Sequence, residues 1–233
     1  MQRRLVCAVC MLVWMAAGCA NHGKPAKETE TGFSPMFNGK DFTGWTYAKN
    51  PKGDDIKVGK GYQIRADDGV IYSTNEDGGR LMSVKEYSDF ELRFDFKLTP
   101  SANNGIGIRC SADGNPAYRG MEIQILDDKG PKYHAPNKEI RPEQYHGSIY
   151  DVVAAKQGFQ KPVGEWNSEQ IIAKGHHITV ILNGTTIVDA NLDDVKDDHV
   201  LAKHPGLHYP TGHVALLGHG SAVEFRNFRI KSF

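Results

Sequence analysis

The residues best suited to chemistry lie in one short segment near the middle of the chain. It reads Glu122-Ile123-Gln124-Ile125-Leu126-Asp127 and follows Met121. In a strand, side chains alternate between two faces, so Glu122 and Gln124 share one face and the apolar residues share the other. Asp127 joins the polar face only if a one-residue bulge lies near Ile125-Leu126, and we expect that bulge. Two carboxylates in such a row suit acid–base chemistry on a sugar, although a merely solvated sheet face is the alternative.

Histidines and tryptophans outside this strand extend the candidate site. His146 precedes Gly147, and His219 stands between two glycines that allow close approach, so either imidazole is a candidate acid or base near neutral pH. Trp45 and Trp166 lie beside Gly, Asp or Asn residues, where an indole can stack on a sugar. A core position is the alternative for each tryptophan.

A divalent metal is a possible cofactor, but nothing in the sequence requires one. Its candidate ligands are Asp127 and five scattered histidines, without a tight ligand spacing: His134, His146, His204, His208 and His219. His176 and His177 precede an expected strand and are interpreted as surface residues.

The elements that must position these residues are strands. From Phe90 to Leu98 every even residue is apolar and every odd residue is charged, which indicates a strand with one face on a core. Residues 178–188 read as a hairpin around Asn183-Gly184. The C-terminal run 223–230 changes its apolar phase, which predicts a bulge near Arg226-Asn227. Further strands are expected at 61–64, 69–73, 105–111, 121–126, 147–150 and 213–217. We therefore predict an all-β antiparallel sandwich or jelly roll in a single domain.

The N-terminal residues have the pattern of an export signal. Arg3 and Arg4 precede an apolar stretch too short to span a bilayer, which ends in Ala16-Ala17-Gly18-Cys19. This predicts a lipoprotein signal peptide over residues 1–18, lipidation of Cys19, a flexible tether over 19–32 and a folded domain over 33–233. The expected location is the periplasm or cell envelope, with the lipid as the membrane contact. Plain secretion is the alternative.

The composition bears on nucleic acid as a partner and on disulfide bonds. The chain has 28 Lys and Arg residues against 28 Asp and Glu residues and no basic cluster, which argues against nucleic acid. After cleavage and lipidation only Cys110 would remain as a free thiol, so no internal disulfide is expected. We interpret Cys110 as a small buried apolar residue.

Several phrases together resemble a known family, the 3-keto-disaccharide hydrolase domain, over roughly residues 33–233. The phrases, in chain order, are Met36-Phe37-Asn38-Gly39-Lys40-Asp41 with Gly44-Trp45, Asp89-Phe90-Glu91-Leu92, Asn103-Asn104-Gly105-Ile106 with Arg109, Glu122 to Asp127, Gly147-Ser148-Ile149-Tyr150, Gly164-Glu165-Trp166-Asn167, Leu182-Asn183-Gly184, and His219-Gly220 with Glu224-Phe225-Arg226-Asn227. The resemblance implies a concanavalin A-like jelly roll, often exported, that acts on carbohydrate.

The same resemblance implies cleavage of 3-keto-glycosides by elimination and hydration. Glu122 or His146 would be the base, Asp127 the acid, and Arg109 and Gln124 ligands of keto or hydroxyl oxygens. The segment is also similar to the Glu-x-Asp-x-x-Glu strand of laminarinase-type glycosidases, but Gln124 and Asp127 replace two of its acids. Because an amide cannot carry charge, ordinary glycoside hydrolysis is disfavoured. A non-catalytic carbohydrate-binding module stays open as the main alternative.

Overall fold

The computed structural model describes residues 30–47, 61–74, 79–136 and 139–233, and Thr31–Phe233 forms one compact unit. The predicted signal peptide, Cys19 and most of the predicted tether lie outside the described residues. Among those described, no helix is both long and apolar enough to cross a membrane.

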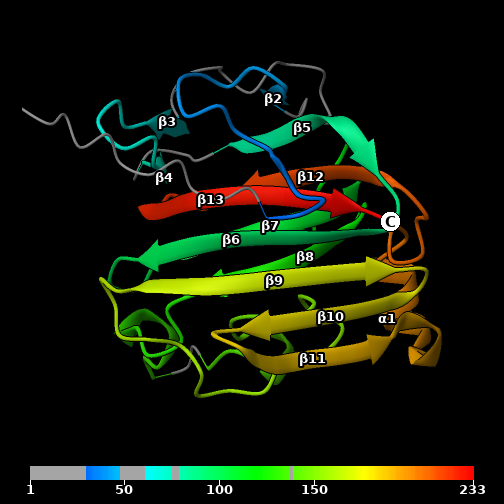
Figure 1. Ribbon diagram of the computed structural model, residues 1–233. Helices are drawn as coiled ribbons and strands as arrows, with labels where there is room; N and C mark the ends of the chain where they lie inside the picture. Colours follow the sequence, from blue (N-terminus) through cyan, green and yellow to red (C-terminus); the bar gives the residue numbers. More distant parts are fainter. Residues whose placement is uncertain (1–29, 48–60, 75–78, 137–138) are drawn as a thin grey trace, which may run out of the picture. The chain divides into compact units, whose positions relative to one another are not determined.

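Two antiparallel sheets form a sandwich of the concanavalin A-like jelly-roll type, as predicted (Figure 1). The larger sheet has the order β11-β10-β9-β6-β13-β4-β3, with β1 beside β13, and the smaller has the order β2-β5-β12-β7-β8. The strands of the larger sheet are β1 (Ser34–Pro35), β3 (Tyr62–Ile64), β4 (Ile71–Ser73), β6 (Phe90–Leu98), β9 (Trp166–Lys174), β10 (His177–Leu182), β11 (Thr185–Asn191) and β13 (Val223–Ser232). Those of the smaller are β2 (Trp45–Tyr47), β5 (Arg80–Tyr87), β7 (Asn103–Cys110), β8 (Met121–Leu126) and β12 (Gly212–Leu217).

Short helices connect some of the strands. They are η1 (Pro131–Tyr133), η2 (Pro142–Gln144), η3 (Leu192–Asp194) and α1 (Asp198–Lys203). α1 begins at the N-cap Asp197, whose carboxylate accepts hydrogen bonds from the His199 and Val200 backbone N–H groups.

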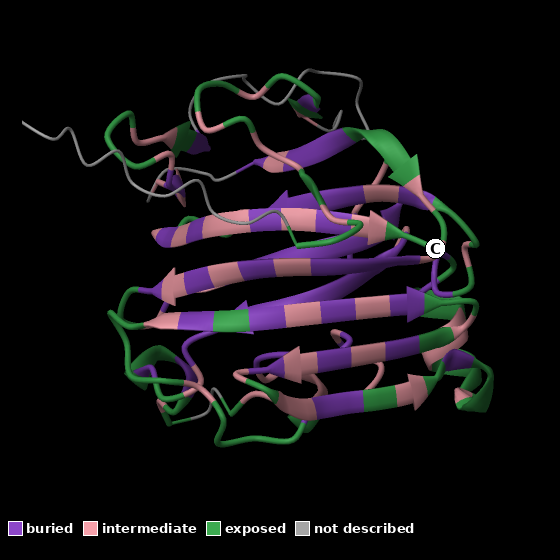
Figure 2. Ribbon diagram, viewed as in Figure 1, coloured by how far each residue is buried: buried purple, intermediate pink, exposed green. Residues whose placement is uncertain are grey.

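Period-2 patterning explains how the sheets make one core. Along β6 the residues Phe90, Leu92, Phe94, Phe96 and Leu98 are all buried and belong to the core cluster. The visible strands of the larger sheet alternate between buried and partly exposed residues (Figure 2). The apolar rows of both sheets therefore face each other, which confirms the predicted orientation of β6.

Two local predictions about strand connections and register are confirmed. β10 and β11 form the expected hairpin, with Asn183 and Gly184 at positive φ angles of 49° and 86°. The pairing of β13 with β6 shifts register between Arg226 and Arg229, and Asn227 has a φ angle of 55°. The C-terminal bulge thus lies where the change of apolar phase predicts it.

Other predictions about the strands are wrong or incomplete. β7 pairs with β8 in continuous register through Asn103 and Leu126, so the bulge expected near Ile125-Leu126 is absent. The segment 147–150 forms only isolated bridges. The strands β1, β2, β5 and β9 were not expected. In β9 the inward-facing residues include Asn167 and Glu169. These polar residues interrupt the apolar alternation by which a strand is recognised in a sequence.

Candidate active site

The candidate active site is built on β8, which presents its polar residues away from the core. Met121, Ile123 and Ile125 belong to the core cluster between the sheets. Glu122 and Gln124 consequently point to the outer face of the smaller sheet. They are nevertheless only 3% and 4% exposed, so other segments must cover them.

One covering segment runs beside β8. The Tyr150 backbone N–H donates to the Glu122 carbonyl at 2.9 Å, and the Gln124 N–H donates to the Ser148 carbonyl at 3.1 Å. Ile149 forms an antiparallel bridge with Ile123 and is buried in the core. This pairing places Tyr150 opposite Glu122 on the outer face of the sheet.

Gly105 on β7 makes room for the Glu122 side chain. A Cβ atom at this position would lie 2.0 Å from Glu122 Oε1 and 2.7 Å from its Cδ. No real carbon atom fits at that distance, so a glycine is required for the carboxylate to lie across β7. The Asn104-Gly105 phrase in the sequence therefore serves the placement of Glu122.

Glu122 on β8 and His219 in the segment after β12 approach each other. His219 follows β12, and its Nε2 lies 3.4 Å from Glu122 Oε1. The His219 side chain is 45% exposed, whereas that of Glu122 is 4% exposed. A buried carboxylate that holds an accessible imidazole is an arrangement used in proton transfer.

An amide–phenol network lies beside this pair. Gln124 Nε2 donates to the Gln144 carbonyl at 3.3 Å, and Gln144 Nε2 donates to the Tyr150 hydroxyl at 3.2 Å. Gln124 Oε1 is buried without a hydrogen-bond partner among the described residues, which leaves one unmet acceptor in this network. We call Glu122, Gln124, Gln144, Tyr150 and His219 the Glu122 cluster.

The hydroxyl of Tyr150 is kept protonated by its surroundings. Burial raises the pKa of Tyr150, and the neighbouring Asp151 charge raises it further. Because the Tyr150 oxygen accepts from Gln144, its O–H hydrogen remains available to donate. Tyr150 can therefore act near neutral pH as a neutral hydrogen-bond donor.

Asp151 lies next to Tyr150 and holds the segment that contributes to the Glu122 cluster. Its backbone has a positive φ angle of 61°, which is uncommon for a residue with a side chain. Its carboxylate is 3% exposed and accepts from Arg141, Lys203 and Gln144. These contacts hold the segment that carries Gln144 and Tyr150.

The family comparison agrees with this architecture. Residues 32–231 match the model of the 3-keto-alpha-glucoside-1,2-lyase-like domain, the 3-keto-disaccharide hydrolase domain predicted from sequence. The chain belongs to this family.

Two relatives and one more distant structure show the extent of the likeness. A 3-keto-disaccharide hydrolase from Bacteroides thetaiotaomicron is 25% identical over 236 residues, covering 86% of this chain and 78% of its own length. A crystal structure from Parabacteroides distasonis, provisionally described as a glycosyl hydrolase, is 27% identical with a TM-score of 0.68, covering 87% of this chain and 94% of that one. The endo-β-1,3(4)-glucanase SCLam is 11% identical with a TM-score of 0.50, covering 86% of this chain and 91% of its own, and it shares the fold.

Among the site residues predicted for this family member, Glu122, Gln124 and His219 come together, but Asp127 does not join them. Asp127 Oδ2 accepts from the Ser101 backbone N–H at 2.7 Å, and its Oδ1 accepts from Lys129 N–H at 3.3 Å. With no bulge to turn it outward, its carboxylate stabilises the turn that follows β8. The expectation that Asp127 lies in the polar row with Glu122 and Gln124 is corrected accordingly.

His146, the alternative base that the family resemblance implied, lies between the sheets and outside the Glu122 cluster. Its Nδ1 accepts from the Leu126 N–H at 3.3 Å, and its ring centroid lies 5.0 Å from that of Phe96. Its Nε2 lies 3.1 Å from Glu169 Oε2, in a pair that is 1% and 0% exposed and whose N–H is not aligned as a hydrogen bond. The His146 imidazole is thus buried on the core side of the smaller sheet.

Arg109 was expected to bind substrate oxygens, but its guanidinium is occupied elsewhere. It donates to the Ser88 carbonyl, the Gly175 carbonyl and Asp89 Oδ1 at 3.0, 2.6 and 3.0 Å. The Arg109 side chain is 1% exposed, and burial lowers its pKa. These contacts give Arg109 a structural role.

Neither predicted tryptophan platform is placed at the Glu122 cluster. Trp45 is buried, stacks on Phe37 with ring centroids 4.2 Å apart and donates its indole N–H to the Met36 carbonyl. Trp166 belongs to β9 in the larger sheet, where the Arg226 guanidinium lies 4.0 Å from its ring centroid. The core alternative is thus correct for Trp45.

The predicted metal ligands do not converge on Asp127. Among the described residues, the group of side chains suited to a metal ion is His176, Asp193 and His208. Only His208 belongs to the predicted ligand set. Cys110 is free and buried as expected, and burial raises the pKa of its thiol.

A hollow of about 550 Å³ opens near the end of β8, lined partly by Asp128, His134, Tyr145 and Gln160. Its lining contains neither Glu122 nor Gln124. Burial raises the pKa of Asp128, whose Oδ1 accepts from the His146 backbone N–H at 2.8 Å. The hollow adjoins the segment that covers β8 without containing the paired groups of the Glu122 cluster.

Sequence reasoning missed two members of the Glu122 cluster, Gln144 and Tyr150. Tyr150 stands in one of the phrases shared with the family, so a signal existed without an assigned role. Gln144 ends the short helix η2, and nothing in its local sequence indicates chemistry. Both reach the site because the segment after η2 pairs with β8.

Proposed function

We propose that this chain cleaves 3-keto-glycosides at the Glu122 cluster. The family name and that of the relative imply a hydrolase or lyase acting on 3-keto sugars. The observation that carries the proposal is the Glu122–His219 pair, a buried carboxylate 3.4 Å from an exposed imidazole, beside the Tyr150 phenol and the Gln124 amide. A base, an acid and oxygen ligands are the groups that such chemistry needs.

The proposed reaction uses the ketone already present at C3 of the sugar. That ketone acidifies the proton on C2, which a base removes to give an enolate. The C1–O bond then breaks, its electron pair leaves with the aglycone oxygen, and that oxygen receives a proton. Water adds across the C1–C2 double bond, with hydroxyl to C1 and hydrogen to C2. The net change is hydrolysis of the glycosidic bond.

We assign proton abstraction to His219, with Glu122 as its orienting partner. If His219 Nε2–H donates to Glu122, the Nδ1 lone pair is free to accept the C2 proton. Tyr150 donates its hydroxyl hydrogen to the enolate oxygen or to the leaving group. Gln124 positions Gln144, and through it the Tyr150 hydroxyl, by donating from its Nε2 to the Gln144 carbonyl.

The decisive experiment compares a 3-keto-disaccharide with the same disaccharide unoxidised, in deuterated water. We expect release of 3-keto-glucose from the keto substrate alone, with deuterium incorporated at C2. Direct displacement at C1 would leave the C2 hydrogen in place and would contradict the elimination. Binding of both sugars without turnover would instead identify a carbohydrate-binding module, and cleavage of the unoxidised sugar an ordinary glycosidase.

The residue assignment is tested by His219→Asn and Glu122→Gln. Each should lower kcat/KM by roughly 10²–10⁴-fold, the usual contribution of general acid–base catalysis, without a change in Tm. His199→Asn, a change at an exposed histidine of α1, is the matched control and should retain wild-type activity. Wild-type rates in both cluster variants would refute the assignment.

We further propose that the chain is exported and anchored by lipid at Cys19. Arg3, Arg4, the short apolar stretch and Ala16-Ala17-Gly18-Cys19 support this. Mass spectrometry of the protein from bacterial membranes should find a diacylglycerol-modified mature N-terminus at residue 19. Cys19→Ser should abolish the modification and membrane recovery, and an intact Met1 in the wild-type chain would rule out the anchor.

A further inference from the structure

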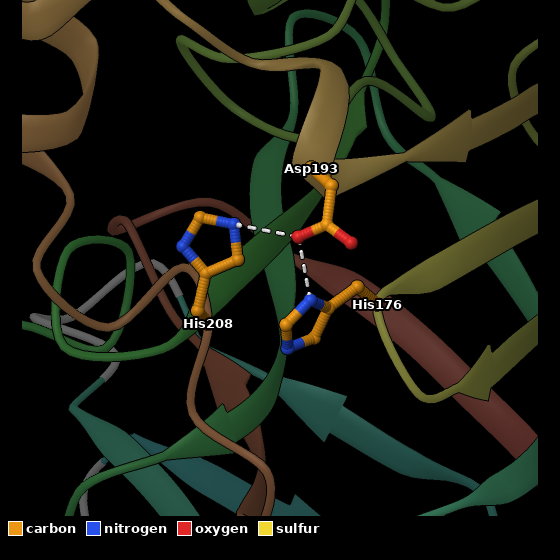
Figure 3. Close-up of side chains that lie close together, drawn as sticks. All are labelled: His176, Asp193 and His208. Atoms are coloured by element: carbon orange, nitrogen blue, oxygen red, sulfur yellow. Dashed lines mark hydrogen bonds and ion pairs between the residues drawn. The ribbon is translucent and has the colours of Figure 1, made fainter.

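Three potential metal ligands converge at one end of the β10–β11 hairpin (Figure 3). His176 lies in the turn between β9 and β10, Asp193 belongs to η3, and His208 follows α1. Their side chains point toward one another, with the Asp193 carboxylate between the two imidazoles. None of them belongs to the Glu122 cluster.

The distances suit a single small cation. Asp193 Oδ1 lies 2.7 Å from His176 Nδ1 and 3.8 Å from His208 Nε2, and all three ligand atoms lie within 4.8 Å of one another. Zinc binds imidazole nitrogen and carboxylate oxygen at about 2.0–2.2 Å, so neighbouring tetrahedral ligands stand roughly 3.3–3.6 Å apart. The Asp193–His176 separation is shorter than this spacing and the Asp193–His208 separation is slightly longer, so coordination requires the side chains to adjust.

The backbone behind the three ligands is firmly held. The Leu192 N–H donates to the His176 carbonyl at 2.9 Å, and the Asn191 side chain accepts from the Asp193 N–H at 3.1 Å. Leu192 and Leu207, which precede two of the ligands, are 0% and 1% exposed. The Gly175 carbonyl, just before His176, accepts from buried Arg109. The ligands therefore project from anchored positions.

The ligand chemistry favours a transition metal over a simple surface ion pair. Both imidazoles approach the same carboxylate oxygen, and their ring centroids are 5.0 Å apart. Two imidazoles and a carboxylate suit Zn²⁺ and similar ions, whereas Mg²⁺ prefers oxygen ligands. The side chains are 39–57% exposed, so water can complete the coordination.

We propose that His176, Asp193 and His208 bind a divalent first-row transition ion such as Zn²⁺. The ion joins the β9–β10 turn to η3 and to the segment after α1. His208 Nε2 lies 3.3 Å from the Leu192 carbonyl, so coordination replaces a hydrogen bond that this nitrogen can donate. The imidazole then carries its proton on Nδ1.

The test uses the untagged full chain, stripped with EDTA and dialysed, and titrated with Zn²⁺ by calorimetry. We expect one Zn²⁺ per chain, and a Tm raised by about 5–10 °C at a free Zn²⁺ concentration 100 times Kd. Mg²⁺ at the same concentration should produce no comparable shift. His176→Ala, Asp193→Asn and His208→Ala should each weaken Zn²⁺ binding by at least about 10-fold.

His177→Ala is the matched control because the same hairpin carries a second histidine–carboxylate pair. His177 Nε2 lies 2.6 Å from Asp189 Oδ1, with similar exposure, but no third metal ligand joins this pair among the described residues. This variant should bind Zn²⁺ as the parent does. The proposal is overturned by the absence of stoichiometric binding, by binding that persists in all three ligand variants, or by equal loss in His177→Ala.

Discussion

Gly105 shows how a missing side chain shapes the Glu122 cluster. The Glu122 carboxylate occupies the space that a Cβ on Gly105 would take, at 2.0 Å from Oε1. The requirement is steric, because Gly105 is not among the residues with a positive φ angle. Substitution at this glycine therefore tests the placement of a neighbouring side chain.

Gly105→Ala should displace the Glu122 carboxylate and separate it from His219. We expect kcat/KM on a 3-keto-disaccharide to fall about 10²-fold, because misplacement by about 1 Å commonly costs that much. Steady-state kinetics together with thermal unfolding provide the measurement.

Gly107→Ala is the comparison for this prediction. Its methyl group would meet Cys110 Sγ at 2.7 Å and Ala215 Cβ at 3.1 Å, not Glu122. This variant should lose stability with a smaller effect on kcat/KM of the folded fraction. Equal kinetic losses in both variants would argue against a specific role of Gly105.

At the scale of elements, the segment 145–150 decides what lies over β8. His146 anchors it by accepting from Leu126 and by packing on Phe96 between the sheets. Glu169 on the opposite sheet faces the same imidazole at 3.1 Å. These contacts of His146 on the core side of β8 hold Gln144 and Tyr150 at the candidate site.

His146→Ala should lower the free energy of unfolding by about 3 kcal/mol, because it leaves a cavity and an unpaired Leu126 N–H. Urea denaturation measures this change. A direct catalytic role predicts the reverse pattern, namely lost turnover with unchanged stability. His213→Ala, at a half-buried histidine of β12, provides a comparison outside this contact.

At the scale of the whole folded unit, Arg109 links parts of both sheets. From β7 in the smaller sheet it reaches Ser88 and Asp89 before β6 and Gly175 after β9. Asp89 Oδ1 also accepts from the Gly175 N–H at 2.9 Å. One buried guanidinium thus joins turns that are distant in sequence.

Arg109→Leu should lower the free energy of unfolding by about 3 kcal/mol, since leucine cannot replace the three hydrogen bonds that the buried guanidinium donates. Arg226→Leu removes a more exposed guanidinium that pairs with Asp95, and it should cost at most about 1 kcal/mol. Denaturant titration of both variants distinguishes these values. A stable Arg109→Leu variant with impaired substrate binding would restore the role first expected from the sequence.

Local patterns were sufficient to predict much of the fold. The alternation in Phe90–Leu98, the Asn183-Gly184 turn and the phase change near Arg226 depend on neighbouring residues, and the structure contains all three features. β9 was missed because Glu169 and Asn167 face inward, where their contacts come from other elements. Local periodicity cannot reveal such positions.

For the candidate site, the sequence by itself determined the family, the strand and the shared face of Glu122 and Gln124, because alternation along a strand is a local property. Only the tertiary structure decided which other residues reach that face. It brought His219 and Tyr150 to that face. It placed Asp127 in a turn and His146 in the core, and it gave Arg109 contacts that link turns of the two sheets. The physical reason is that pairing between strands and burial between sheets depend on residues far apart in the chain.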